Sequence, residues 1–141
     1  MRVTYWQQNS GTKRAARVHL VNRSPDPITG VELRMTGYTT AVRDERRGYL
    51  VGLTLPPCTE FTYIAEKLVF TYWRAGRVLK EALVDWQAED MDFTDGDGNS
   101  WRRTQISLLR IDCPGHPSSM SSIGYQGQPT SKQAVVCGSD G

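Results

Sequence analysis

The chain has 141 residues, the length of one domain, with 38% hydrophobic and 23% charged residues. This composition excludes a wholly disordered chain, and a net charge of +2 is far below the strongly basic balance of most nucleic-acid-binding domains. No stretch approaches the roughly 18 uncharged apolar residues of a transmembrane helix, and residues 1–11 contain no apolar signal segment. We therefore expect no membrane insertion and a cytoplasmic location.

The three cysteines, Cys58, Cys113 and Cys137, are an odd number without a CxxC spacing. A disulfide framework uses an even number and an oxidising compartment, so reduced thiols are the simpler interpretation. A Cys113–Cys137 bridge is the alternative. No common nucleotide-binding, zinc-binding or hydrolase motif is present, so we expect no cofactor.

Several segments alternate apolar and polar residues, which is the pattern of half-buried antiparallel strands. The predicted strands, in chain order, cover residues 18–22, 31–35, 49–55, 68–73, 91–94 and 100–104. The segments between them are rich in Pro, Gly, Asp and Asn, which form turns. Residues 78–84 fit either a short helix or a turn. This spacing predicts an all-β sandwich of about seven antiparallel strands in residues 1–112.

The composition changes near residue 113. Residues 113–141 contain five Gly, six Ser and three Pro, with one apolar cluster at residues 134–136. Such a segment buries too little surface to offset the entropy of ordering it. We therefore expect a flexible C-terminal tail, or one that a partner orders.

Three segments carry a family resemblance. They are residues 18–33 (VHLVNRSPDPITGVEL), the Leu55-Pro56-Pro57 break and residues 93–103 (FTDGDGNSWRR). Their order resembles the immunoglobulin-like domains of uncharacterised actinobacterial proteins and, more loosely, CARDB-type or fibronectin-III-like sandwiches. The likeness covers residues 15–104, with a gap at 65–85. It implies an immunoglobulin-like β-sandwich and no catalytic residues.

Acidic residues concentrate in one short region. Asp95, Asp97 and Asn99 have a spacing that could direct three oxygen ligands at Ca²⁺, but Ser100 and Ile106 stand where an EF-hand loop needs Gly and Glu. A hairpin turn stabilised by local hydrogen bonds is the favoured interpretation. The carboxylates of Asp90, Asp92, Asp95 and Asp97 are candidates for an acid–base pair, although a solvated face at the end of a strand is the simpler explanation.

Arginines lie beside aromatic residues in two places, which is a pattern of single-stranded nucleic-acid platforms. The basic clusters are Lys13-Arg14-Arg17, Arg43-Arg46-Arg47, Arg74-Arg77 and Arg102-Arg103. Acidic residues are interleaved with them, so nucleic acid is the less favoured partner. His19 is expected to face outward from its strand or to be a fully hydrogen-bonded histidine.

The expected function is non-catalytic: a protein–protein interaction or scaffold module with another protein as partner. The exposed members of one set of residues would form the contact: Tyr5, Trp6, Tyr72, Trp73, Trp101, Arg102 and Arg103. A structural subunit of a larger, phage-like assembly and a single-stranded nucleic-acid binder are the alternatives. We expect no enzymatic activity.

Overall fold

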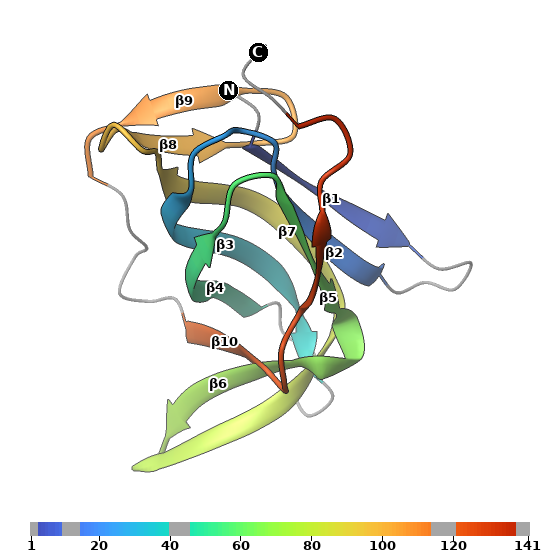
Figure 1. Cartoon of the computed structure of the whole chain (residues 1–141). Helices are drawn as coiled ribbons and strands as arrows, with labels where there is room; N and C mark the ends of the chain where they lie inside the picture. The colour runs from blue at the N-terminus through green and yellow to red at the C-terminus, as the bar shows by residue number, and fades with distance from the viewer. Residues whose placement is uncertain (1–2, 10–14, 40–45, 114–120, 138–141) are drawn as a thin grey trace.

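The structure is a computed structural model, and it describes residues 3–9, 15–39, 46–113 and 121–137. The described strands pair into two sheets (Figure 1). The smaller sheet has the order β1 (Val3–Asn9), β2 (Ala15–Asn22), β5 (Thr59–Ile64) and β11 (Thr130–Gln133). The larger sheet has the order β3 (Ile28–Thr39), β4 (Arg46–Leu55), β10 (Ser121–Tyr125), β6 (Leu68–Arg74), β7 (Arg77–Thr94), β8 (Ser100–Arg103) and β9 (Leu108–Ile111). A single 3-10 turn, η1 (Ala65–Lys67), joins β5 to β6.

This architecture confirms the predicted all-β, sandwich-like class. All six predicted strand segments lie within strands of the structure, except that β8 ends at Arg103. Residues 78–84, for which a short helix or a turn was expected, belong instead to β7. Residues 1–112 hold nine described strands rather than about seven, and β1, β5 and β9 were not among the predicted segments.

β7 organises the larger sheet because its 18 residues pair with three other strands, with β3 and β8 both pairing with its last residues. Its first part pairs with β6, a longer part pairs with β3, and its last residues pair with β8. The β3–β7 pairing adds to the linear strand order, so the pairings β3–β4–β10–β6–β7–β3 form a closed circuit. Gly48 of β4 lies inside this circuit, where an added Cβ would be 2.7 Å from Ile123 Cγ1 and 3.0 Å from Phe70 Cε2.

Register shifts change which residues of a strand face the core. Opposite Arg34 and Met35 of β3, the paired residues of β7 are Asp90 and Ala88, so Glu89 is an extra residue. Ala88 and Met91 are therefore both buried although they are three positions apart. A β-bulge of this kind inverts the alternation on its strand.

The core lies between the two sheets. Its largest fully buried side chains are Tyr63, Phe70 and Phe93. Val18 and Leu20 of β2 face this core, whereas the intervening His19 lies on the outer face of the smaller sheet. Burial of these apolar side chains is the main stabilising contribution to the fold.

The C-terminal segment differs from the expected flexible tail. β10 lies between β4, to which it is parallel, and β6, to which it is antiparallel. Its Ile123 is 3% exposed and belongs to the core. β11 pairs with β5 at the edge of the smaller sheet. Tyr125 of β10 also packs against the core. Ile123 and Tyr125 suffice because β10 lies between β4 and β6, whose side chains supply much of the surrounding core.

The cysteine pairing also differs from both expectations. Cys58 and Cys137 form a disulfide, with their Cα atoms 5.4 Å apart, and Cys113 is free and exposed. This separation is within the usual range for bridged cysteines. The reduced-thiol interpretation is wrong because Cys58 and Cys137 are brought together by the β5–β11 pairing, which a separation of 79 residues does not reveal. The cysteine content therefore no longer argues for the cytosol.

Candidate functional site

The hairpin of β6 and β7 projects beyond the other strands at the bottom of Figure 1. Ala75 and Gly76 make its turn with φ angles of 50° and 75°. Two positive φ values in a two-residue loop are the geometry of a type I′ turn, which matches the twist of the flanking strands. This turn places Trp73 directly opposite Val78.

Trp73 and Val78 form an exposed apolar pair at this tip, which we call the hairpin tip. The Trp73 side chain is 73% exposed and the Val78 side chain 48%. Arg77 and Lys80 on the same hairpin are also exposed. The tip therefore combines a large aromatic ring with positive charge. Of the neighbouring Tyr72, only the backbone position in β6 is described.

Trp6 lies on a different surface, the outer face of the smaller sheet, and is 44% exposed. Its ring stacks on that of His19, with centroids 3.7 Å apart and planes inclined by 7°. His19 Nδ1 is 3.2 Å from Glu60 Oε2 and 3.0 Å from Thr62 Oγ1, and its Nε2 is 3.3 Å from Gln8 Oε1. His19 thus faces outward from its strand and is also fully hydrogen-bonded, in agreement with both expectations.

Burial changes the pKa of His19. The pKa lies below its usual value because burial disfavours the charged form of the ring. The carboxylate of Glu60 opposes this effect but does not outweigh it. Both ring nitrogens have partners, so His19 stabilises the sheet rather than offering a free base.

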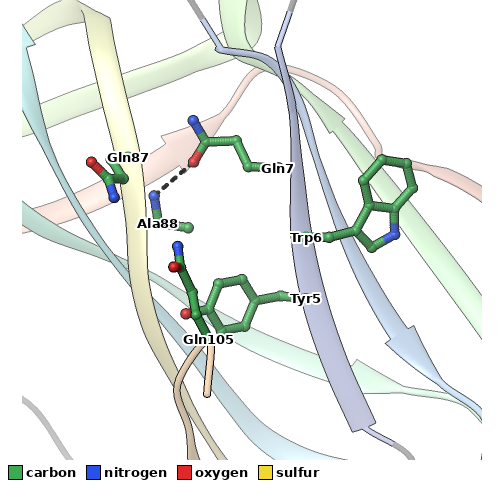
Figure 2. Close-up of a pocket in the computed structure, with 6 residues that line it drawn as sticks. All are labelled: Tyr5, Trp6, Gln7, Gln87, Ala88 and Gln105. Atoms are coloured by element: carbon green, nitrogen blue, oxygen red, sulfur yellow. Dashed lines mark hydrogen bonds between the residues drawn. The ribbon is translucent and has the colours of Figure 1, made fainter.

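Tyr5 is buried and connects the two sheets. Its hydroxyl donates a 2.7 Å hydrogen bond to the Glu89 carbonyl, at the extra residue of the β7 bulge. Burial raises the pKa of Tyr5 to about 12. Gln7 makes a similar connection, since its amide oxygen accepts from Ala88 N at 3.0 Å (Figure 2) and its Nε2 donates to Trp86 O at 3.3 Å. Tyr5 is therefore not part of an exposed contact.

A pocket of about 450 Å³ lies beside these inter-sheet contacts. Figure 2 shows its lining residues, and the Trp6 ring points away from the other side chains, across β1. The described lining residues are Tyr5, Trp6, Gln7, Gln87, Ala88 and Gln105. The hydrogen-bonding side chains among them include three glutamines and Tyr5, whose hydroxyl binds the Glu89 carbonyl.

Trp101, Arg102 and Arg103 do not form an exposed patch. Trp101 packs against the core, and its Nε1 donates to Asp95 Oδ2 at 2.8 Å. Arg102 Nε and Nη2 bind the two oxygens of Asp92 at 2.8 and 3.0 Å, and these hydrogen bonds raise the pKa of the guanidinium. Arg103 is half-buried. The contacts of Trp101 and Arg102 stabilise the end of the larger sheet.

Two of the four candidate acid–base residues, Asp90 and Asp92, are also held in ion pairs. Asp92 is 1% exposed and binds Arg34 as well as Arg102. Arg34 Nε also pairs with Asp90. Neither carboxylate lines the pocket. A buried carboxylate between two guanidinium groups is a structural ion-pair network, not an acid–base pair.

Residues 95–99 form the favoured hairpin turn. Asp95 Oδ1 accepts hydrogen bonds from the backbone N–H groups of Asp97 and Asn99, at 2.9 and 3.0 Å, and its Oδ2 accepts from Trp101. Although burial alone raises the pKa of Asp95, these hydrogen bonds lower it overall. Within the described ranges, no group of three or more His, Cys, Asp and Glu side chains could hold a metal ion.

The predicted site residues are therefore not brought together. Trp6 and Trp73 are exposed on separate surfaces, while Tyr5 and Trp101 support the core. Lys13, Arg14 and Arg43, which belong to two of the basic clusters, lie outside the described residues. Sequence reasoning missed Val78 and the glutamine-lined pocket. Gly76, within an alternating apolar segment, was the signal that could have indicated the hairpin turn beside Val78.

Comparison with known protein families, curated proteins and solved structures finds no match. The two-sheet architecture is compatible with the expected sandwich, but it does not distinguish an immunoglobulin-like domain from other sandwiches. In the described part of the chain, no helix has the length and apolarity needed to cross a membrane.

Proposed function

We propose that this chain is a non-catalytic binding module, with an immunoglobulin-like type of sandwich, that engages another protein through the hairpin tip. The exposure of Trp73, 73% on a projecting hairpin, carries this proposal. Burying a large aromatic side chain that is otherwise in contact with water gives a favourable free energy. Tryptophan is among the residues that contribute most to the binding energy of protein interfaces.

The neighbouring charges indicate the kind of partner surface that fits. Trp73 and Val78 would enter an apolar depression, and Arg77 and Lys80 would meet acidic groups at its rim. Interfaces commonly combine an apolar centre with a polar rim. Charge at a rim mainly accelerates association, so binding would weaken as the salt concentration rises.

The test is capture of a partner from the source cell by the purified chain, followed by affinity measurement with the isolated partner. Trp73→Ala should weaken binding by about thirtyfold or more, as expected for an interface anchor worth about 2 kcal/mol. Ile106→Ala is a matched control, because Ile106 is 96% exposed but lies in the β8–β9 turn. A partner that binds wild type and Trp73→Ala equally would refute the proposal.

A further inference from the structure

The β5 edge of the smaller sheet is covered by β11, a strand that makes few stabilising contacts of its own. β11 lies at the edge of the described sheet, and all four of its side chains are exposed. The following Ala134 is buried, but it is not part of the main core, and Val135 and Val136 are more than 70% exposed. Because β11 buries so little apolar surface, hydrophobic packing contributes little to holding it.

β11 is retained by its short backbone ladder with β5, by the disulfide and by a few further hydrogen bonds. Ala134 N donates to Cys58 O at 2.8 Å, and Arg23 Nε donates to Val135 O at 3.1 Å. Lys132 Nζ is 3.3 Å from Glu60 Oε2, with the lysine side chain 60% exposed. The lysine end of this pair lies in solvent, which reduces the stabilisation that the pair gives. Because the ladder is short and little apolar surface is buried, the covalent bond from Cys58 to Cys137 is the main further restraint on β11.

The surface beneath β11 is the backbone edge of β5. Residues Thr59–Thr62 pair with Thr130–Gln133 in antiparallel register, with Glu60 opposite Lys132. Glu60 is only 6% exposed and also contacts His19. The edge therefore offers ladder hydrogen bonds together with one carboxylate, and the ligand that it holds here is an extended peptide with a lysine facing that carboxylate.

We infer that β11 is a releasable cover on the β5 edge, and that reducing the Cys58–Cys137 disulfide opens this edge to an extended peptide of a partner with a basic residue opposite Glu60. A dithiol reductant supplies two electrons and two protons: the Cys58–Cys137 bond breaks, both cysteines become thiols, and the reductant is oxidised to its own disulfide. The incoming strand then takes the place of β11 by strand addition. This site is separate from the hairpin tip.

Hydrogen exchange of the full chain tests the release. Reduction with dithiothreitol should accelerate exchange of the β5–β11 amides by about tenfold or more, while the β1–β2 amides keep their protection. Cys137→Ser should show the released state without reductant, and Cys113→Ser should behave as wild type because Cys113 is free. Unchanged β5–β11 exchange would overturn the inference, and so would loss of β1–β2 protection, which would make the disulfide a staple of the whole fold.

A synthetic peptide with the sequence of residues 129–135, PTSKQAV, tests the opened edge. It is titrated into ¹⁵N-labelled Cys137→Ser at about millimolar concentration, because the tethered strand competes at a similar effective concentration. Amide signals of Thr59–Thr62 should shift, and a peptide with glutamate in place of the lysine should bind about fivefold more weakly. Absence of shifts, or equal binding of both peptides, would overturn the assignment of the partner.

Discussion

Replacement of Gly48 by alanine tests the position of β10 between β4 and β6. The new Cβ would lie 2.7 Å from Cγ1 and 2.8 Å from Cδ1 of Ile123, and 3.0 Å from Phe70 Cε2. Both neighbours are at most 3% exposed, so neither side chain can move into solvent. Overpacking of this kind costs about 1–3 kcal/mol. We expect Gly48→Ala to lower the free energy of unfolding, measured by urea denaturation, by about 2 kcal/mol.

A double-mutant cycle separates this clash from other effects. Ile123→Ala alone should cost about 2–5 kcal/mol because it leaves a cavity. In the double variant, the methyl group at position 48 occupies part of that cavity, so the combined cost should be about 1–2 kcal/mol less than the sum. Gly124→Ala is the control, since its added Cβ has only the Val69 carbonyl oxygen near it, at 4.0 Å. Simple additivity, or a harmless Gly48→Ala, would show that β10 does not lie against β4.

Three further predictions concern titratable and hydrogen-bonding groups. Because burial lowers the pKa of His19, the unfolded chain binds a proton more readily, so the free energy of unfolding should fall as the pH drops below about 6.5. His19→Gln should reduce this slope between pH 7 and 5, and an unchanged slope would contradict the assignment. Asp95→Ala should cost about 1–2 kcal/mol in urea denaturation, because two backbone N–H groups and the Trp101 indole lose their acceptor, whereas added Ca²⁺ should leave the melting temperature of wild type unchanged. A rise with Ca²⁺ would restore the metal-site interpretation. Tyr5→Phe should cost about 1 kcal/mol through loss of the hydrogen bond to Glu89 O, and a neutral effect would place the hydroxyl in solvent.

Local sequence patterns were sufficient to predict segments of six of the described strands (β2, β3, β4, β6, β7 and β8), because such patterns depend only on neighbouring residues. The alternation of side chains along a strand also indicates which of two adjacent candidate site residues can be exposed on a given face of the sheet. Adjacent residues on a strand face opposite sides, so Tyr5 and Trp6 could not both be exposed on one face. The structure buries Tyr5 and exposes Trp6. The same reasoning separates the core-packed Trp101 from the outward-facing Arg102.

Where the prediction failed, the cause was contacts between distant residues. The segment 121–137 is poor in apolar residues, so composition alone indicated a tail, yet it completes both sheets because β4, β5 and β6 present unpaired edges to it. The bulge at Glu89 inverts the exposure pattern of β7 and positions the carbonyl that Tyr5 binds. Neither feature has a local signal.

The all-β class, the positions of most strands and the turn at Asp95 were thus determined by the sequence alone, because side-chain alternation and turn-forming residues act over a few positions. Which strands pair, which cysteines bond and which tryptophans remain in water were decided only by the tertiary structure. Strand pairing, disulfide bonding and tryptophan exposure depend on contacts between residues far apart in the sequence, such as the two bonded cysteines, which are 79 positions apart. A single sequence contains no local pattern that indicates which distant residues are in contact.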